Sequence, residues 1–267
     1  MKCIKKITGV IIAVLILTSC GSVPLTGRRQ ILLVSDSELV SASLVQYNDY
    51  MKSATKSADK TKSAMVERAG KKIASATETY LKQNGLEREL ANFSWEFTLI
   101  KSDEVNAFCM PGGKIVVYEG LLPLVSSEDE LAVVIGHEVA HAVAKHSNER
   151  MSQELMTQYG SSIFSAALSK KSAAIQTIGG TVFGLGSQLV YMLPYSRQHE
   201  YEADYMGLVF MTMAGYNPNS AVAFWQKMSS ASGGGSSSDF MSTHPSDSKR
   251  IAEIQRRMPE MEKYKKK

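Results

Sequence analysis

The chain has 267 residues, with 30 Lys and Arg against 26 Asp and Glu, so its formal net charge at neutral pH is +4. The excess sits at the two ends of the chain, and the sequence shows no basic surface of the kind that binds nucleic acid, so we expect no nucleic-acid partner. Three cysteines cannot build a disulfide framework in a chain of this length. Its stability must come from a hydrophobic core large enough for one domain.

The first twenty residues are typical of an export signal. Three lysines precede an apolar run at 7–17, which is too short to span a bilayer comfortably. The run closes on small residues and Cys20, as in bacterial lipoproteins, so we expect a signal peptide at 1–19 and a lipid on Cys20. An uncleaved anchor is the alternative. Because Gly21 follows rather than an acidic residue, we expect a chain held at the bacterial cell envelope, at the outer membrane and facing the periplasm.

The rest of the chain is predicted to be one domain behind a short tether. Residues 20–34 combine the lipid tether with a short apolar strand. Residues 35–267 form the domain, in which 35–85 shows helical periodicity twice and predicts a preface of two helices that ends at Gly85. The remaining residues, 90–267, are predicted to form the core of the domain.

A small sheet is predicted directly after the helical preface. The apolar pattern predicts three strands, the last two joined by a turn at Gly112 and Gly113: 95–100, 107–110 and 114–118. An edge strand of such a sheet can bind an extended peptide by pairing with it. Strands with only a structural role are the alternative. Cys109 in this sheet is expected to be a buried hydrophobe rather than a nucleophile.

A helix with two histidines follows the sheet. The run 130–146 has apolar residues at helical spacing and opens on a capping box. His137 and His141 are four residues apart, so their imidazoles share a face and can bind one metal ion. Glu138 projects beside them, where a carboxylate can take a proton from an attacking water. A chance match to this short pattern is the alternative, and its place inside an apolar helix argues against chance.

Two glycine-rich segments lie in the second half of the chain. The apolar segment 173–193 is interrupted by polar residues, so it predicts a buried or interfacial helical hairpin rather than a membrane span. Whether this segment covers a cleft or contacts a membrane is left open by the sequence. Residues 229–238 are rich in Gly and Ser and predict a flexible surface loop.

A third metal ligand is predicted on a helix at 196–214. Glu200 and Asp204 share a face of this helix with the small residues Ala203 and Gly207, which suits close packing against another helix. Glu200 is therefore the best third ligand, and Asp204 would accept a hydrogen bond from a ligand imidazole. Charges exposed on the surface of a helix are the alternative.

The order His137-Glu138-x-x-His141 and then Glu200-x-x-x-Asp204 resembles metallopeptidase family forty-eight. This family contains the CAAX prenyl proteases, the mitochondrial Oma-type proteases and a bacterial branch of BepA-like and LoiP-like lipoproteins. The resemblance implies an α+β, mainly helical fold of the gluzincin type with a small β-sheet next to the HExxH helix. It also implies one Zn²⁺ per chain, held by His137, His141 and Glu200.

Three shorter stretches extend the resemblance. Asn106, with the turn at Gly112 and Gly113, matches the substrate-side hairpin of the family, and 24–28 resembles the lead-in of its lipoprotein branch. His244 precedes a proline and matches the His-Pro motif of the family, in which the histidine contacts the metal or steadies the oxyanion. By itself, a histidine before proline is more often a structural turn residue.

Together these features predict a membrane-anchored zinc metalloendopeptidase. Glu138 would accept a proton from water, and His244 or Arg197 would offset the charge of the oxyanion. The expected substrates are misfolded or unassembled envelope proteins, and the expected membrane contact is through lipidated Cys20. The first alternative is a periplasmic chaperone or assembly factor for outer-membrane proteins with a latent metal site. The second is a structural lipoprotein with a coincidental motif. The sequence leaves the oligomeric state and the cleavage preference open.

Overall fold

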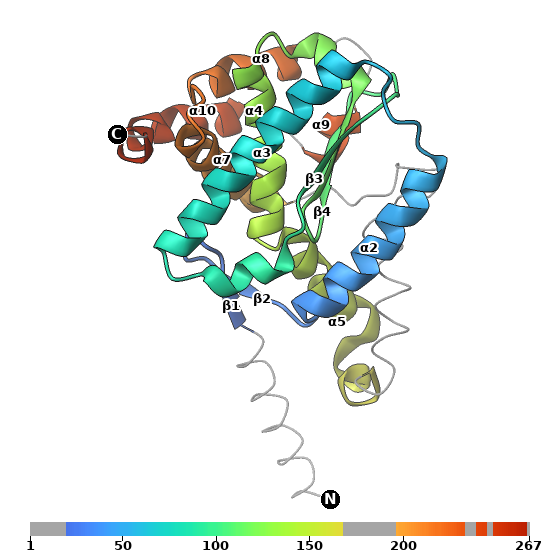
Figure 1. Cartoon of the computed structure of the whole chain (residues 1–267). Helices are drawn as coiled ribbons and strands as arrows, with labels where there is room; N and C mark the ends of the chain where they lie inside the picture. The colour runs from blue at the N-terminus through green and yellow to red at the C-terminus, as the bar shows by residue number, and fades with distance from the viewer. Residues whose placement is uncertain (1–19, 168–195, 233–238, 245–247, 266–267) are drawn as a thin grey trace, which may run out of the picture.

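The computed structural model describes residues 20–167, 196–232, 239–244 and 248–265 (Figure 1). The predicted signal peptide at 1–19 and the glycine-rich segment at 173–193 lie outside the described residues, as does most of the loop predicted at 229–238. The first residues of that loop are helical instead, because they continue a helix that ends at Ser232. Within the part of the chain that the structure describes, no helix is both long and apolar enough to cross a membrane.

The described residues are mainly helical, as the sequence predicts, and contain two small sheets where the sequence predicts one sheet and a separate short strand. The α-helices are α2 (Asp36–Ser53), α3 (Lys60–Gln83), α4 (Glu128–Val143), α5 (His146–Ala167), α7 (Arg197–Met213), α8 (Ser220–Ser232), α9 (Asp239–Thr243) and α10 (Ser248–Arg257). Short 3-10 segments cover Glu87–Asn92, Glu119–Leu124 and Met258–Tyr264. The strands are β1 (Cys20–Ser22), β2 (Arg29–Ile31), β3 (Glu96–Ile100), β4 (Ala107–Met110) and β5 (Lys114–Tyr118).

One predicted helix is two helices in the structure. The run 130–146 was expected to be continuous, but α4 ends at Val143 and α5 begins at His146. Between them Lys145 adopts a left-handed φ of 58°. Its ammonium group is half-buried and pairs with Asp36 at 2.7 Å and with Glu89 at 2.8 Å. These contacts with the first residue of α2 and with the 3-10 segment Glu87–Asn92 stabilise a turn that the local pattern does not reveal.

The three-stranded sheet has the order β3-β5-β4. β5 pairs in parallel with β3 and antiparallel with β4, so β4 is an edge strand. The turn between β4 and β5 contains Gly112 and Gly113 at φ values of +92° and +81°. Glycine adopts this left-handed backbone without a steric penalty, which explains the predicted hairpin. A second, two-stranded sheet pairs β1 with β2.

The three-stranded sheet is buried on both faces. On one face Ile115 and Val117 pack into the main core with α3, α4 and α7. On the other face Phe108 and Val116 pack against α2. Figure 1 shows α2 on the far side of the strands from α3 and α4. The helix with the two predicted metal ligands therefore lies at the centre of the molecule.

α4 and α7 meet backbone to backbone. A Cβ atom built on Gly136 would lie 3.0 Å from the carbonyl oxygen of Gly207, and one built on Gly207 would lie 2.9 Å from the carbonyl carbon of Gly136. No larger residue fits at this crossing without a shift of one helix. The predicted close packing of the Gly207 helix is confirmed, and it brings the carboxylates of α7 within reach of the histidines of α4.

Candidate metal centre

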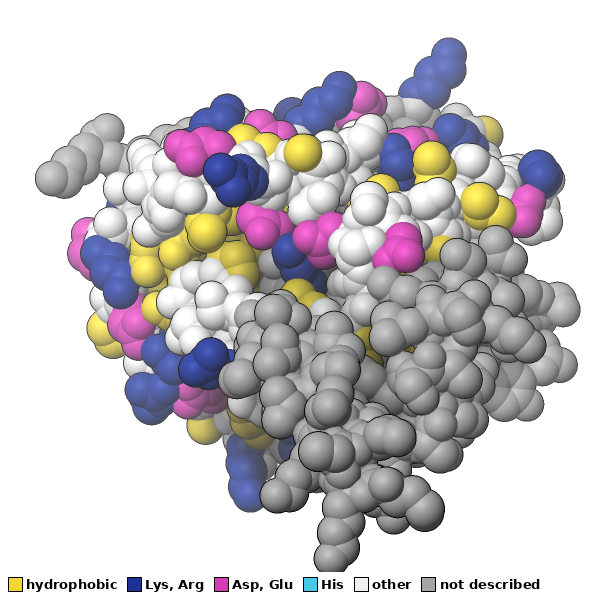
Figure 2. Space-filling view, turned by 90° about the horizontal axis from the view of Figure 1, so that it is seen from below, with side chains coloured by type: hydrophobic (Ala, Val, Ile, Leu, Met, Phe, Trp, Pro, Cys, Tyr) yellow, Lys and Arg dark blue, Asp and Glu magenta, His cyan; other side chains and the backbone are white. Residues whose placement is uncertain are grey.

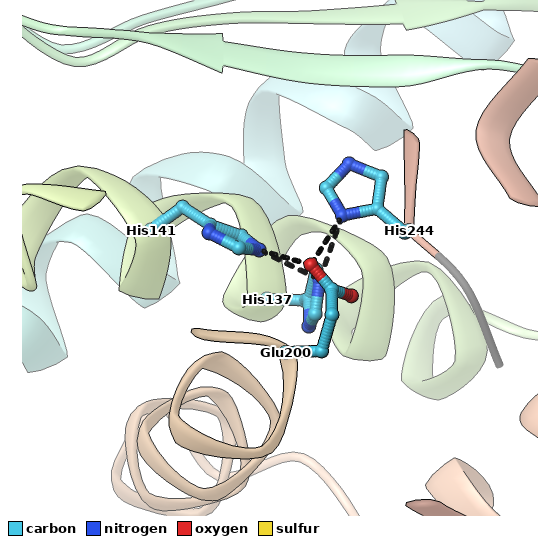
Figure 3. Close-up of side chains that lie close together, drawn as sticks. All are labelled: His137, His141, Glu200 and His244. Carbon is cyan, nitrogen blue, oxygen red and sulfur yellow. Dashed lines mark hydrogen bonds and ion pairs between the residues drawn. The ribbon is translucent and has the colours of Figure 1, made fainter. Parts of the chain in front are cut away.

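Four side chains from different parts of the chain meet at the centre of the fold. α4 presents His137 and His141 on one face, α7 brings Glu200 toward them, and His244 follows directly after α9 (Figure 3). All four are buried. One candidate ligand atom from each lies within 4.8 Å of those of the other three. The structure thus brings together the three predicted ligands and adds His244 as a fourth donor.

The donor atoms of this four-residue cluster converge. Nε2 of His137 and Nε2 of His141 lie 3.0 Å apart. The carboxylate oxygens of Glu200 lie 3.3 Å from these nitrogens, Oε2 from His137 and Oε1 from His141. Nδ1 of His244 lies 3.1 Å from Oε1 of Glu200. Imidazole nitrogens and a carboxylate, enclosed by protein, form a donor set that suits zinc, so these residues fit a divalent metal ion.

A buried ion network holds the ring of His137 from behind. Its Nδ1 atom lies 2.9 Å from Oδ1 of Asp204, which confirms the expected position of that carboxylate. Arg250 donates to both oxygens of Asp204 and lies 2.8 Å from Oε2 of Glu200. The guanidinium also stacks on the ring of Trp225, 3.7 Å from its centroid. We call Asp204, Arg250 and their contacts the Asp204–Arg250 network.

A second buried network holds the ring of His141. Its Nδ1 atom lies 2.8 Å from Nδ1 of His146, and Nε2 of His146 lies 3.0 Å from Oε2 of Glu202. Arg28 donates from Nε to the same oxygen at 2.8 Å, and the hydroxyl of Thr26 donates to Oε1 of Glu202. Burial lowers the pKa of His146 to about 4, more than Glu202 offsets, so this ring is neutral at neutral pH.

This second network closes on itself through Glu149. The two terminal nitrogens of Arg28 donate to Oε1 and Oε2 of Glu149 at 2.9 and 2.7 Å. Oε2 of Glu149 lies 3.0 Å from Nε2 of His199, whose ring stacks on that of His146 with centroids 4.3 Å apart. We call these five residues the Glu202–Arg28 network: Arg28, His146, Glu149, His199 and Glu202.

Sequence reasoning did not find the Glu202–Arg28 network. The sequence pattern draws attention only to the face of the 196–214 helix that carries Glu200 and Asp204, whereas the structure shows that Glu202 on the same helix is also buried. The signal in the sequence is that the chain has only five histidines. In the structure all five belong to the cluster or to this network. None of them shows among the coloured atoms of the face in Figure 2. Histidines confined to one buried region indicate a polar centre.

Burial and charge shift the pKa values of two carboxylates in opposite directions: Glu200 in the cluster and Glu138 beside it. Burial raises the pKa of Glu138, and the neighbouring His244 and His137 offset only part of this rise. Burial acts on Glu200 as well, but the charges of His244 and Arg250 hold the pKa of that carboxyl well below its usual range. Glu200 is therefore ionised, as a metal ligand must be, whereas Glu138 is a better proton acceptor than an ordinary carboxylate.

Glu138 lies between the cluster and the edge strand. Its Oε1 atom is 3.4 Å from Nε2 of His244 and has no hydrogen-bond partner among the described residues. The backbone N–H of Cys109, in β4, donates to the same carboxylate. Cys109 itself is buried, as expected, and burial raises the pKa of its thiol. An unpartnered carboxylate oxygen beside the metal ligands can accept a proton from water.

The predicted substrate-side residues lie around β4. Asn106 precedes this strand and is buried, with its side-chain oxygen accepting from the backbone N–H of Ala107 at 2.8 Å. Gly112 lines a small cavity of about 30 Å³ that also touches His141. Gly113 packs under the ring of Trp95, where a Cβ would lie 2.5 Å from the ring. Asn106 and Gly113 therefore shape the hairpin, and Gly112 brings its turn close to the cluster.

The structure does not bring Arg197 into the cluster. Arg197 is exposed in the first turn of α7, although it is only three residues from Glu200. The guanidinium that does reach Glu200 belongs to Arg250, which is buried. The spacing of charges along α7 could not show whether Arg197 or Arg250 reaches Glu200, since it carries no information about the packing of α10 against α7.

Comparisons with known proteins agree with this geometry. The sequence model of peptidase family M48 matches residues 60–258. The mitochondrial metalloendopeptidase OMA1 of Schizosaccharomyces pombe is 40% identical over 172 residues, which cover 64% of this chain and 49% of that protein. The mitochondrial metalloendopeptidase OMA1 of Homo sapiens is 26% identical over 264 residues, which cover 94% of this chain and 48% of that protein.

A bacterial relative is also similar. The beta-barrel assembly-enhancing protease of Escherichia coli is 28% identical over 174 residues, which cover 62% of this chain and 35% of that protein. The chain thus spans between about a third and a half of the curated relatives described here. The match to the family model begins at residue 60, so Thr26 and Arg28 lie outside it.

Proposed function

Because this chain belongs to peptidase family M48, we propose that it is a zinc-dependent metalloendopeptidase with one metal ion per chain. His137, His141 and Glu200 would hold the ion. The observation that carries the proposal is the convergence of these three buried donors beside Glu138, whose Oε1 atom is unpartnered. We also propose that the chain is one domain at 35–267.

The residues around the cluster can perform peptide hydrolysis. A bound zinc ion would supply Lewis acidity for the scissile carbonyl and for the attacking water. Glu138 accepts the proton of that water and passes it to the leaving amine, and its raised pKa suits this role. His244 would donate to the developing oxyanion, because it lies in the cluster whereas Arg197 is exposed. The Asp204–Arg250 network keeps the ring of His137 oriented.

The edge strand is the proposed substrate-docking element. β4 lies at the edge of its sheet, and the N–H of Cys109 on this strand reaches Glu138. A peptide that pairs with such an edge would pass the proton acceptor, and main-chain pairing tolerates many sequences. This favours unfolded chains as substrates, and we propose misfolded or unassembled envelope proteins.

The proposed location is the bacterial cell envelope. Cys20 would carry a lipid after cleavage of 1–19 and would hold the chain at the outer membrane, facing the periplasm. The apolar run and the small residues before Cys20 support this proposal. We also propose that the chain belongs to the BepA-like and LoiP-like branch of the family, which the similarity to the Escherichia coli protease supports.

The first test is zinc content together with cleavage of casein by the purified chain. We expect about one zinc per chain. Glu138→Gln should keep the zinc and lose activity by 10²- to 10⁴-fold. Glu200→Ala should lose zinc and activity together. A folded wild-type chain without zinc, or a Glu138→Gln variant as active as wild type, would show that the proposed mechanism is wrong.

A latent site in a chaperone or assembly factor is the second candidate. The observation that favours it is His244, whose Nδ1 atom lies close enough to Glu200 to be a fourth donor in a closed site. Complementation separates the two functions. A deletion strain restored by Glu138→Gln would support the chaperone, and failure of a stably folded Glu138→Gln would support the peptidase.

A further inference from the structure

We propose that Arg28 is a positioning residue for the metal centre. It acts through Glu202 and His146, and it holds the ring of His141 in the tautomer that has its lone pair on Nε2. The inference rests on the proposed function in one respect, that the four-residue cluster binds a metal ion. It assigns a role to a segment that precedes the part of the chain matched by the family model.

The first step of the argument is the direction of the hydrogen bonds. A carboxylate only accepts, so the proton between Glu202 and His146 is carried by Nε2 of the histidine. The Nδ1 atoms of His141 and His146 lie 2.8 Å apart, so one of them carries the shared proton and the other accepts it. Nε2 of His141 faces the cluster, and an imidazole that binds a metal through Nε2 carries its proton on Nδ1. Nδ1 of His141 is then the donor and Nδ1 of His146 the acceptor, which agrees with a proton on Nε2 of His146.

The second step is the position of Glu202. Arg28 donates to its Oε2 atom, and Thr26 donates to its Oε1 atom. The same guanidinium forms a bidentate pair with Glu149. Two carboxylates from α5 and α7 are thus fixed by one cation, and a planar guanidinium keeps both at defined angles. The alignment of the His146 ring depends on this arrangement.

The third step is the rigidity of the segment that carries Arg28. β1 and β2 pair antiparallel, with Ser22 opposite Arg29. The turn between them is closed by hydrogen bonds from the N–H of Val23 to the carbonyl of Arg28 at 2.8 Å and from the N–H of Gly27 to the carbonyl of Val23 at 2.9 Å. A closed hairpin presents the side chain of Arg28 with little loss of entropy.

The test is the zinc affinity of the full-length chain, measured by competition with a chromophoric chelator. Substitutions that disturb the hydrogen-bond partners of a ligand typically weaken metal binding by about 10- to 100-fold, and we expect this of Arg28→Met. Arg28→Lys keeps the charge and should restore part of the loss. Arg68→Met is the matched control, since it removes an arginine–carboxylate pair with Glu128 on the surface, and it should bind zinc as wild type does.

A second readout separates positioning from folding. The visible absorption of the Co²⁺-substituted chain reports ligand geometry and needs no catalysis. We expect Arg28→Met to change this spectrum and Arg68→Met to leave it unchanged. If Arg28→Met does not fold, Thr26→Val decides the question, because it removes only one donor to Glu202. Thr26→Val should weaken zinc binding by a few-fold with an unchanged unfolding midpoint.

The outcomes are distinct. Zinc bound equally by the wild type and by folded Arg28→Met, or by Thr26→Val, together with an unchanged Co²⁺ spectrum, would overturn this inference and leave the proposed function intact. A wild-type chain that binds no zinc would overturn both. Weaker binding and a changed spectrum in Arg28→Met, with Arg68→Met as wild type, would establish Arg28 as a positioning residue.

Discussion

The two histidines of α4 are held in different ways. Nδ1 of His137 contacts a carboxylate directly, that of Asp204. Nδ1 of His141 contacts a second imidazole, and the carboxylate of Glu202 lies one step further away. The same chemical requirement, a fixed tautomer for each candidate ligand, is thus met through one hydrogen bond for His137 and through two successive hydrogen bonds for His141.

The cations that complete the two networks differ in origin and exposure. Arg250 comes from α10, is 1% exposed and stacks on Trp225. Arg28 comes from the N-terminal hairpin, and its side chain is 16% exposed. Breaking the Asp204–Arg250 network should therefore cost more stability than breaking the Glu202–Arg28 network, because water can solvate the partners of Arg28 more easily.

The largest effect is expected from Arg250→Met, which breaks the Asp204–Arg250 network alone. It leaves the buried carboxylates of Asp204 and Glu200 without their cation, so the metal-free chain should lose about 3–5 kcal/mol of its free energy of unfolding. Urea denaturation measures this loss. A loss no larger than that caused by Arg28→Met would contradict the ranking of the two networks.

Gly207→Ala tests what the two networks have in common, since Asp204 and Glu202 both lie on α7. The added Cβ meets the backbone of Gly136, and such overpacking costs about 1–3 kcal/mol. Helix propensity alone would instead give a gain of about 1 kcal/mol. The sign of the change in thermal denaturation decides between the two effects. Gly136→Ala should behave in the same way, and a stabilised variant would show that the crossing is loose.

Glu149→Gln weakens the Glu202–Arg28 network alone and should change how the free energy of unfolding depends on pH. Burial alone would raise the pKa of Glu149, but hydrogen bonds from His199 and Arg28 lower it to about 2. The ionised carboxylate therefore stabilises the fold above its unfolded pKa of about 4.5, and this stabilisation disappears as the pH falls toward 2. We expect wild type to exceed the variant by about 1.5 kcal/mol at pH 6 and by much less at pH 2.5. A difference independent of pH would contradict this assignment.

Arg68→Met should have the smallest effect and touches neither network. Arg68 pairs with Glu128 at the start of α4, and the arginine is half exposed. Solvent screens such a pair, so we expect no measurable change in zinc affinity or in the unfolding midpoint. A change in zinc affinity would mean that the start of α4 communicates with the cluster, and the comparison of the two networks would then be incomplete.

The sequence predicted the Asp204 side of the centre because its information is local. His137 and His141 are one helical turn apart, and so are Glu200 and Asp204, so helical geometry alone gives the shared faces. The small residue Gly207 then indicates which faces meet. Three ligands and one supporting carboxylate follow from two helices.

The Arg28 side could not be predicted because its information is not local. Arg28 contacts Glu202 across 174 positions of the chain, and no spacing rule relates them. His146 contacts His141 across a break that depends on the left-handed Lys145 and on its ion pair with Asp36. In a continuous helix, as the apolar pattern predicts, His146 would lie five residues after His141 and would point away from the face that carries it.

The N-terminal hairpin also limits the distance between Cys20 and the candidate metal centre. Only seven residues separate Cys20 from Arg28, and even fully extended this stretch spans less than about 30 Å. The pairing of Cys20 with Ile31 shortens it further. If Cys20 carries a lipid, as we propose, the short connection keeps the metal centre close to the bilayer surface and prevents it from reaching far into the periplasm. The substrates of this metal centre would then be polypeptides that remain at the bilayer surface.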